Sequence, residues 1–366
     1  MSEIKVNSIK GVGATNAAIT VNNSDGTCTA NITNNLSNRR LNINGQMSVV
    51  QRGTSITSQG YTPDRYYQEF NNAGSITHTI SQQSLTSSDT PYSLGFRYFQ
   101  RHALSAAGTA NAAADLHTQH TIEAQDMAHS GWNYTSTSSF LTISFWVRVS
   151  TSQKFYLSLR TRDGTSQNYN IPFTPSENTW TKVIAKVPGN SNLQFDNNND
   201  KGLHLNFYKF LGTDDTGGSS ENAWVAYSGT AKVPDMASTW LTAGASTFDL
   251  TGLQVEVGSV ATDFEHRSFA EELALCKRYF QHWMGSYRYS STSSQHHAVS
   301  FYPSMRAIPT VVRTAYYFGS YEDGSTTANV NFQIGSNGCI GQTYLLHYGN
   351  SSSTAVGGYG TLSAEL

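Results

Sequence analysis

Apolar and polar residues alternate with a period of two through much of residues 41–265, which is the pattern of half-buried β-strands. The clearest case is the run LTISFWVRV at 141–149. One face of that strand carries Leu141, Ile143, Phe145, Val147 and Val149. The residues between them point the other way, so a single strand can cover a core and still present a second, more polar surface.

Similar runs at 154–173, 179–187, 202–210 and 248–258 predict further strands. Asp163-Gly164 marks a hairpin turn within the first of these runs. Many short strands separated by turns predict a two-sheet sandwich or jelly roll. We therefore expect a mainly β fold with a jelly-roll β-sandwich over residues 41–267.

Residues 1–40 hold only short apolar runs, around Ile4 and Val21, with an Asp25-Gly26 turn signal between polar stretches. A segment this short and this polar cannot bury a core of its own. The sequence therefore predicts an extended N-terminal arm that becomes ordered on a partner or within an oligomer.

A helix is predicted over 268–283, where Ser268 and Glu271 have the spacing of a capping box. Apolar residues then recur at steps of four and three, the spacing of a heptad seam, at Phe269, Leu273, Cys276, Phe280 and Trp283. The seam lasts about two heptads, which is shorter than a coiled coil normally needs. Two interpretations remain open: a helix packed on a sheet, or three such helices around a threefold axis.

Residues 284–366 predict a second, smaller β domain. Pro303 and Pro309 interrupt its strand-like runs, and prolines are tolerated at the edges of sheets. Tyrosines are concentrated there, including Tyr287, Tyr289, Tyr302, Tyr316, Tyr317 and Tyr321. Flat rings with hydroxyl groups can stack on sugars and bond to them, so these tyrosines are candidate ligand contacts. The alternative is that they pack a small sheet.

The surface chemistry is uncharged but polar. Charged residues make up 13% of the chain, about half of the roughly 25% in an ordinary globular protein, and the mean hydropathy is still −0.40. The net charge of −2 gives no electrostatic reason to bind nucleic acid. No apolar run is long enough to predict insertion into a membrane. Such a surface suits a protein that works outside cells.

The three cysteines, Cys28, Cys276 and Cys339, are far apart and follow no metal-binding spacing. They predict reduced thiols rather than a disulfide framework or a zinc site. The N-terminus has no apolar leader, so we expect the chain to fold in a cytoplasm. A virion component meets both conditions, because lysis releases it.

Several stretches together resemble a recurring family of bacteriophage tail-fibre proteins. They are LNINGQMSVVQRGTS (41–55), YTPDRYY (61–67), LQVEVGSVATDFEHRSFAEELALCKRYFQ (253–281) and FYPSMRAIPTVV (301–312). The pair FLTISFWVRVS and ENTWTKVIAKVPG is similar to the sheets of carbohydrate-binding-module-like jelly rolls. The resemblance covers roughly 41–312, and its most specific segment is 253–281.

The resemblance implies a subunit of a tail fibre or virion appendage, homotrimeric, and made in the host cytoplasm. Residues 1–40 would bind another virion protein, and the distal β domains would bind a glycan or protein of the host surface. One alternative is a structural decoration subunit of capsid, neck or tail without a receptor; a polysaccharide depolymerase is a weaker one. Structural roles are expected for Asp64-Arg65 and Glu265/Arg267 as ion pairs that hold the sandwich ends together. Glu256 and Glu265 would flank a tight turn at Gly258.

Catalytic and metal-binding patterns are weak. The acids Asp196, Asp200, Asp214, Asp215 and Glu221 lie in Asn- and Gly-rich loops, where acids are common in turns, and no GxSxG element occurs. Asp196, Asn198 and Asp200 alternate as in a calcium loop, but an EF-hand would need Gly at Lys201 and Glu at Phe207. A solvated turn or a calcium site of another geometry remains.

Histidines give an equally weak signal. His117 and His120 have HxxH spacing and His296-His297 are adjacent, which fits either loop histidines or a metal on a trimer axis. No phosphate-binding glycine motif occurs in a strand–helix context. We therefore expect no cofactor, no metal and no enzymatic activity.

Overall fold

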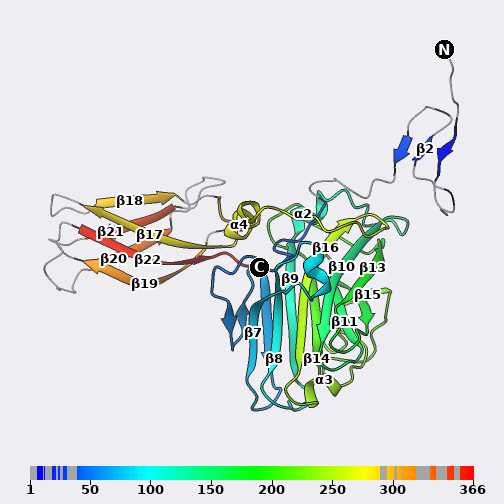
Figure 1. Ribbon diagram of the computed structural model, residues 1–366. Helices are drawn as coiled ribbons and strands as arrows, with labels where there is room; N and C mark the ends of the chain where they lie inside the picture. The colour runs from blue at the N-terminus through cyan, green and yellow to red at the C-terminus, as the bar shows by residue number, and fades with distance from the viewer. Residues whose placement is uncertain are drawn as a thin grey trace.

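The computed structural model describes residues 39–288 without a break. It also describes short stretches toward the two ends, at 6–10, 12, 19–21, 24, 28–30, 295–300, 303–307, 309–318, 330–334, 344–349 and 355–366. Over these residues the chain is mainly β, with a few short helices, as the alternation predicts (Figure 1).

Two antiparallel sheets form the predicted β-sandwich. The six-stranded sheet has the order β13-β10-β16-β8-β7-β4, from Thr181–Pro188, Phe140–Val149, Thr247–Val257, Tyr98–Leu104, His78–Ser84 and Ser55–Ile56. The seven-stranded sheet has the order β15-β12-β11-β14-β9-β6-β5, from Trp224–Ala226, Gln167–Phe173, Phe155–Thr161, Lys201–Leu211, Asp115–Glu123, Tyr66–Asn71 and Gly60–Tyr61. Neighbouring strands are mostly distant in sequence, so the chain crosses repeatedly between the sheets.

Aromatic side chains fill the space between the two sheets. Phe145 of β10 lies 5.1 Å from Phe207 of β14 and 5.2 Å from Phe173 of β12, measured between ring centroids. The short helix α3, Thr239–Thr242, closes one end of the core with Trp240. Each fully buried side chain of this size contributes about 1.5–3 kcal/mol. The packing of these side chains holds the two sheets together.

The interior also contains a polar cluster. His78 Nε2 lies 3.0 Å from His102 Nδ1, and His102 Nε2 lies 3.0 Å from the hydroxyl of Thr118, which also accepts a hydrogen bond from the buried amine of Lys209. Burial, and then the nearby Lys209, lowers the pKa of His78 to about 3 and lowers that of His102 well below its usual value. Burial also lowers the pKa of Lys209 well below its usual range. At neutral pH both imidazoles are therefore uncharged.

Residues 1–40 contain regular structure of their own. The strands β1 (Ser8–Ile9), β2 (Ile19–Val21) and β3 (Cys28–Ala30) pair into a small antiparallel sheet. The strand β2 falls on the short apolar run that ends at Val21, and pairing satisfies the backbone groups of these short strands. Binding of this segment to another virion protein stays a prediction.

The predicted helix is shorter than its periodicity suggests. The helix α4 spans Phe269–Lys277 and begins with the predicted capping box between Ser268 and Glu271. The chain then enters β17, Phe280–Arg288, which pairs along its length with β22, Ala355–Ser363. Aromatic residues favour strands, and a partner strand distant in sequence overrides the local helical spacing.

The proposed seam Phe269, Leu273, Cys276, Phe280 and Trp283 is therefore wrong as one helical stripe, since Phe280 and Trp283 belong to β17. Cys276 and Phe280 are buried within the chain, whereas the side chain of Phe269 is 59% exposed. Burial raises the pKa of the Cys276 thiol well above its usual value. The helix packs on a sheet, and the homotrimer stays a prediction.

Two further three-stranded sheets make up the C-terminal β region. One has the order β17-β22-β19, with β19 at Thr310–Phe318; the other has the order β18-β21-β20, from Gln295–Ser300, Tyr344–Gly349 and Val330–Ile334. In Figure 1 these strands extend away from the sandwich on the side where α4 lies, and the C-terminus returns to the sandwich. Two other short helices, α1 (Thr90–Ser93) and α2 (Ala124–Ala128), belong to connections of the sandwich.

The interior histidines predict that stability falls in acid. Their pKa values are lower in the folded chain than the usual value of about 6.5, so the unfolded chain binds more protons below that pH. The free energy of unfolding should therefore drop as the pH falls from about 6.5 toward about 3. Urea unfolding of the wild type and of the His78→Gln/His102→Gln variant measures this, and the variant should have the shallower slope. Equal slopes would show that this cluster does not titrate as described.

Gly45 gives a sharper test of the packing. A Cβ at this position would lie 2.1 Å from the carbonyl oxygen of Leu253 and 2.8 Å from the Arg40 guanidinium. Gly45→Ala should therefore cost at least about 1–3 kcal/mol in urea unfolding, the usual cost of overpacking. Gly229→Ala is the control, because no atom lies within 4 Å of its Cβ position. Equal stability of the two variants would contradict this packing.

Candidate functional site

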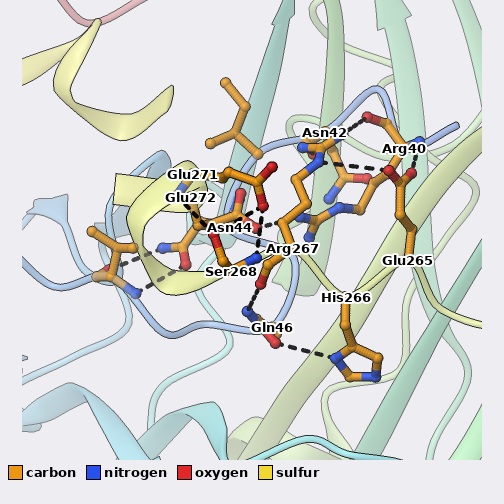
Figure 2. Close-up of polar contacts among 12 residues, drawn as sticks. Arg40, Asn42, Asn44, Gln46, Glu265, His266, Arg267, Ser268, Glu271 and Glu272 are labelled. Carbon is orange, nitrogen blue, oxygen red and sulfur yellow. Dashed lines mark hydrogen bonds and ion pairs between the residues drawn. The ribbon is translucent and has the colours of Figure 1, made fainter. Parts of the chain in front are cut away.

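The two motif segments 41–55 and 253–281 meet in a buried polar cluster, which we call the joint (Figure 2). The joint consists of Arg40, Asn42, Asn44, Gln51, Asp64, Arg65, Glu265, Arg267 and Glu272. At its centre the guanidinium of Arg40 pairs with the carboxylate of Glu272, and both side chains are fully buried. The other carboxylate oxygen of Glu272 accepts the backbone N–H of Asn44 at 2.6 Å. One helical residue thus holds the chain segment that precedes the first strand of the sandwich.

Two asparagines and a glutamate bind backbone groups in the joint. Asn42 accepts the N–H of Val255 at 2.9 Å and donates to the carbonyl of Leu253 at 2.8 Å, which fixes this segment beside β16. Asn44 accepts the N–H of Val49 and donates to its carbonyl. The carboxylate of Glu265 accepts the N–H groups of Arg39 and Arg40 at 2.8 and 2.7 Å.

The ion pairs expected from the sequence take part in the joint. Arg267 lies 3.9 Å from Glu265, as predicted. Asp64 and Arg65 do not pair with one another: Asp64 lies 3.7 Å from Arg52, and Arg65 pairs with Glu365. Both residues thus supply ion pairs, and the partner of Arg65 is distant in sequence.

The same region also contacts the residues that connect α4 to β17. The Arg65 guanidinium lies over the Tyr279 ring, 3.4 Å from its centroid, and donates to the carbonyl of Thr121 at 2.8 Å. Arg278 binds Glu123 through two hydrogen bonds of 2.9 Å. The joint therefore links the sandwich, α4 and the C-terminal sheet. Its chemistry is structural.

The turn after β16 also follows the sequence expectation. Glu256 accepts the N–H of Thr262 at 2.9 Å and its hydroxyl at 2.5 Å. Gly258 has a φ of +139°, which favours glycine. The two acids Glu256 and Glu265 thus shape the connection from β16 to α4.

A groove of about 810 Å³ lies beside the joint. It is lined by Arg40, Leu41, Ile43, Asp126, His129, Ser130, Arg267, Glu271, Ala274, Leu275, Arg278, Pro303 and Ser304. The guanidinium groups on its wall already have partners: Arg40 pairs with Glu272, Arg278 pairs with Glu123, and Arg267 donates to the carbonyl of Arg40. The groove is therefore the outer margin of the joint. Two nitrogens of Arg40, Nε and Nη1, are buried without a hydrogen-bond partner among the described residues.

The outer side of the seven-stranded sheet carries a different kind of surface, which we call the polar face. Its members are Tyr67, Glu69, His117, Gln119, Ser158, Arg160, Asn168, Asn170, His204, Asn206 and Tyr208. The alternation along β14 explains it, since His204, Asn206 and Tyr208 interrupt the core residues at 203, 205 and 207. Residues opposite one another in neighbouring strands share a face, so these side chains form continuous rows.

One row crosses the middle of the sheet. Asn206 lies opposite Ser158 on one side and Gln119 on the other, and Gln119 lies opposite Tyr67. A second row places Tyr208 opposite His117, with 5.0 Å between the ring centroids. Tyr67, His117 and Gln119 are partly exposed. This part of the polar face is therefore only partly covered by the chain.

The segment 212–236 covers another part of the polar face. Lys232 offers its backbone carbonyl to Asn168 at 2.5 Å, and the Ser219 hydroxyl accepts from Asn170 at 2.8 Å. Val233 is buried in a cluster with Tyr156 and Tyr208. A rigid wall thus stands beside the open rows of β9 and β6.

Two polar atoms of the face lack partners. Asn206 Oδ1 and His204 Nε2 are buried, and neither has a hydrogen-bond partner among the described residues. Both side chains are 5% exposed. An unpaired buried polar group costs about 1–3 kcal/mol, and such groups call for an explanation such as a bound ligand or water. Hydroxyl groups of a sugar are suitable partners for both atoms.

Three of the tyrosines singled out in the sequence lie on strands of another sheet, and the other three lie outside the described residues. Tyr287 lies on β17, and Tyr316 and Tyr317 lie on β19, where the structure describes only the backbone. Tyr289, Tyr302 and Tyr321 lie outside the described residues, as does the side chain of each of His296 and His297. Ligand binding by the C-terminal tyrosines stays a prediction.

The HxxH pair does not form a binding site. His117 and His120 both lie on β9 rather than in the expected loop. Residues three apart on a strand point to opposite sides, and His120 is buried in the interior while His117 binds Asp115 at 2.5 Å on the polar face. Within the described part of the chain, no three metal-binding side chains are close enough to hold an ion.

The loop acids have structural contacts. Asp215 pairs with Lys232 at 2.8 Å, and Glu221 pairs with Lys154 at 3.0 Å. In the loop with the calcium-like alternation of Asp196, Asn198 and Asp200, Asn198 accepts the N–H of Asp200 at 2.9 Å, as in an ordinary turn. No helix among the described residues is long and apolar enough to cross a membrane.

The sequence matches no model of a protein family, and no curated protein matches it. Solved structures show distant similarity. A CBM4 structure is 10% identical, with a TM-score of 0.30, over 59% of this chain and 98% of that one. The CBM22-1–GH10 modules of Clostridium thermocellum endo-1,4-beta-D-xylanase 10B, complexed with xylohexaose, are 8% identical, with a TM-score of 0.25, over 55% and 29%.

The tripod (BppUct-A-L) from the baseplate of bacteriophage Tuc2009 is also similar. It is 11% identical, with a TM-score of 0.27, over 87% of this chain and 88% of that one. Similarities at this level establish neither a shared family nor a shared function.

The joint predicts a large effect of one substitution. Glu272→Gln keeps the shape of the side chain but leaves Arg40 charged, buried and unpaired, which should cost about 3–5 kcal/mol in urea unfolding. Glu271→Gln is the matched control on the same helix, because Glu271 is exposed and glutamine also serves in a capping box. A loss for Glu272→Gln no greater than that of the control would contradict the assigned role.

Proposed function

We propose that this chain is a subunit of a phage tail fibre or related virion appendage, and that it binds a glycan of the host surface on its polar face. The observation that carries the binding proposal is the row Asn206–Gln119–Tyr67 on a rigid sheet, with the Asn206 carbonyl oxygen unpaired. The virion assignment rests on the resemblance of the motif segments.

The chemistry of the polar face suits sugars. Partly exposed rings of Tyr67 and His117 can stack on the C–H faces of a pyranose, and the Gln119 amide offers both a donor and an acceptor to its hydroxyl groups. The sheet fixes the spacing of these groups before a ligand arrives, which lowers the entropy cost of binding.

Binding without turnover fits the carboxylates of this face. A glycosidase needs two acids about 5–10 Å apart across the scissile bond. On the polar face Asp115 is engaged by His117 at 2.5 Å and by Lys232 at 3.6 Å, and Glu69 accepts from Gln59 at 2.9 Å. These partners support a binding rather than a hydrolytic role.

The joint fits a subunit that must transmit load. It ties the segment after residue 38 to α4 and to the C-terminal sheet through buried charges. An appendage of several copies would add weak glycan contacts into strong adhesion. The alternative is a decoration subunit without a receptor. The joint is compatible with that role too, but the role does not account for the rows of polar side chains on the polar face.

Affinity electrophoresis against a panel of soluble polysaccharides tests the proposal. The variant Tyr67→Ala/Gln119→Ala should bind at least about tenfold more weakly than the wild type, a loss of about 1.4 kcal/mol. The control is Lys182→Ala on the opposite sheet, where the side chain is exposed. Equal binding by both variants would place the ligand elsewhere.

Two further readouts separate the rivals. A wild-type chain that retards on no polysaccharide and adsorbs to no bacterial cell would favour the decoration subunit. A fall in polymer size during incubation, measured by size-exclusion chromatography, would favour the depolymerase.

A further inference from the structure

Four basic residues gather at one end of the polar face, where β11 ends and β14 begins. They are Arg160, Arg162, Lys201 and His204, and we call them the cationic corner. Arg160 lies directly opposite His204 in the paired strands, and the N–H of Arg162 donates to the carbonyl of Gly202 at 2.9 Å. Two adjacent strands therefore bring four basic side chains to one place in a chain whose net charge is −2.

The arginines and the lysine of this corner form no close ion pair with a carboxylate of the described residues, since no acid there lies within ion-pair distance of Arg160, Arg162 or Lys201. The Arg160 guanidinium lies over the Tyr227 ring, 3.4 Å from its centroid, and Arg162 Nε is buried without a partner. Lys232, in the segment that covers another part of the polar face, is by contrast paired with Asp215 at 2.8 Å.

The acids nearest to the corner interact with it only at longer range. Asp163 lies near Arg162 and Asp200 near Lys201, while Glu123, opposite Lys201, is paired with Arg278. Asp200 is 77% exposed and lies 3.8 Å from Arg306. Asp163 accepts the N–H of Asp196 at 3.1 Å, and burial raises the pKa of Asp163. Neither Asp163 nor Asp200 supplies a counter-charge to Arg160 or His204.

His204 is the buried member of the corner. Its side chain is 5% exposed, and its Nε2 atom has no hydrogen-bond partner among the described residues. Burial, and then the positive charges of Arg162, Lys201 and Arg160, lowers the pKa of His204 well below its usual value. A neutral imidazole with an unpaired nitrogen is thus surrounded by cations.

We propose that the cationic corner binds an anionic group of the glycan, a carboxylate, sulfate or phosphate, through Arg160, Arg162, Lys201 and the Nε2 of His204. This rests on the proposed glycan-binding function and names its ligand class, an acidic polysaccharide. The anion relieves the repulsion among three cations and supplies the missing hydrogen-bond acceptor. Arginine is suited to this task, since its planar fork matches the two oxygens of a carboxylate.

The position of the corner extends the sugar-binding row. His204 lies two residues before Asn206 on the same face of β14, so a sugar above Asn206 and Gln119 would present a neighbouring substituent to the corner. Neutral rings and acidic substituents would then be recognised by separate residues of one surface.

Affinity electrophoresis with three probes tests the inference: polygalacturonate for carboxylate, dextran sulfate for sulfate, and unmodified dextran as the neutral polymer. The wild type should bind an acidic probe at least about tenfold more tightly than dextran. Arg162→Gln/Lys201→Gln should abolish that preference, and the control Lys154→Gln/Lys186→Gln, which removes two exposed lysines, should retain it. Loss of the preference in both variants would point to general charge attraction and overturn the site.

An NMR titration gives a readout that does not depend on polymer binding. Adding galacturonate, sulfate or inorganic phosphate should shift the imidazole signals of His204 and raise its pKa, and the shift should vanish in Arg162→Gln/Lys201→Gln. An unmoved His204 signal with all three anions would overturn the inference. If the His204 signal shifts but no polysaccharide is retained, the anion site stands and the proposed glycan-binding function fails. If dextran and the acidic polymers bind equally and the His204 signal does not shift, the glycan-binding function stands and the anion site fails.

Discussion

The buried ion pair between Arg40 and Glu272 is the constraint on which the rest of this architecture depends. Two charges removed from water are costly unless they are paired and hydrogen-bonded, so neither residue can leave the other without a large penalty. A pair of this kind adds little net stability, but it selects one arrangement. Here it fixes α4 against the segment 41–45, and α4 in turn sets where β17 begins. The sandwich and the C-terminal sheet are thereby parts of one construction.

The strand β14 connects this construction to the proposed function. Its inner residues, such as Phe207, fill the core, and its outer residues, such as Asn206, form the middle of the polar face. The packing of the apolar core stabilises the fold enough to offset the cost of unpaired polar atoms on the outer side of the sheet. Stability generated by apolar packing thus permits a surface with unpaired hydrogen-bonding groups, which the proposed function assigns to a ligand.

Local features of the fold are readable from the sequence. Period-two alternation identifies strands such as 141–149, and the capping box at Ser268 identifies the start of α4. The end of α4 is not readable, because Phe280 leaves the helical pattern to pair with Ser363, far along the chain. The polar face is hidden for the same reason: alternation tells that Asn206 and Gln119 point outward, but only the order of the strands makes them neighbours. The motif segments likewise mark the joint without revealing that Arg40 meets Glu272.

Hydrogen–deuterium exchange of the whole chain, with and without a tightly bound acidic polysaccharide, tests most directly that a rigid scaffold presents one ligand surface. The account predicts new protection in the strands of the polar face, β6, β9, β11 and β14, while the amides of Asn44 and Val255, bonded to Glu272 and Asn42, stay protected in both states. Protection gained only in β17 and β19, or rapid exchange of Asn44 and Val255 in the free protein, would contradict it.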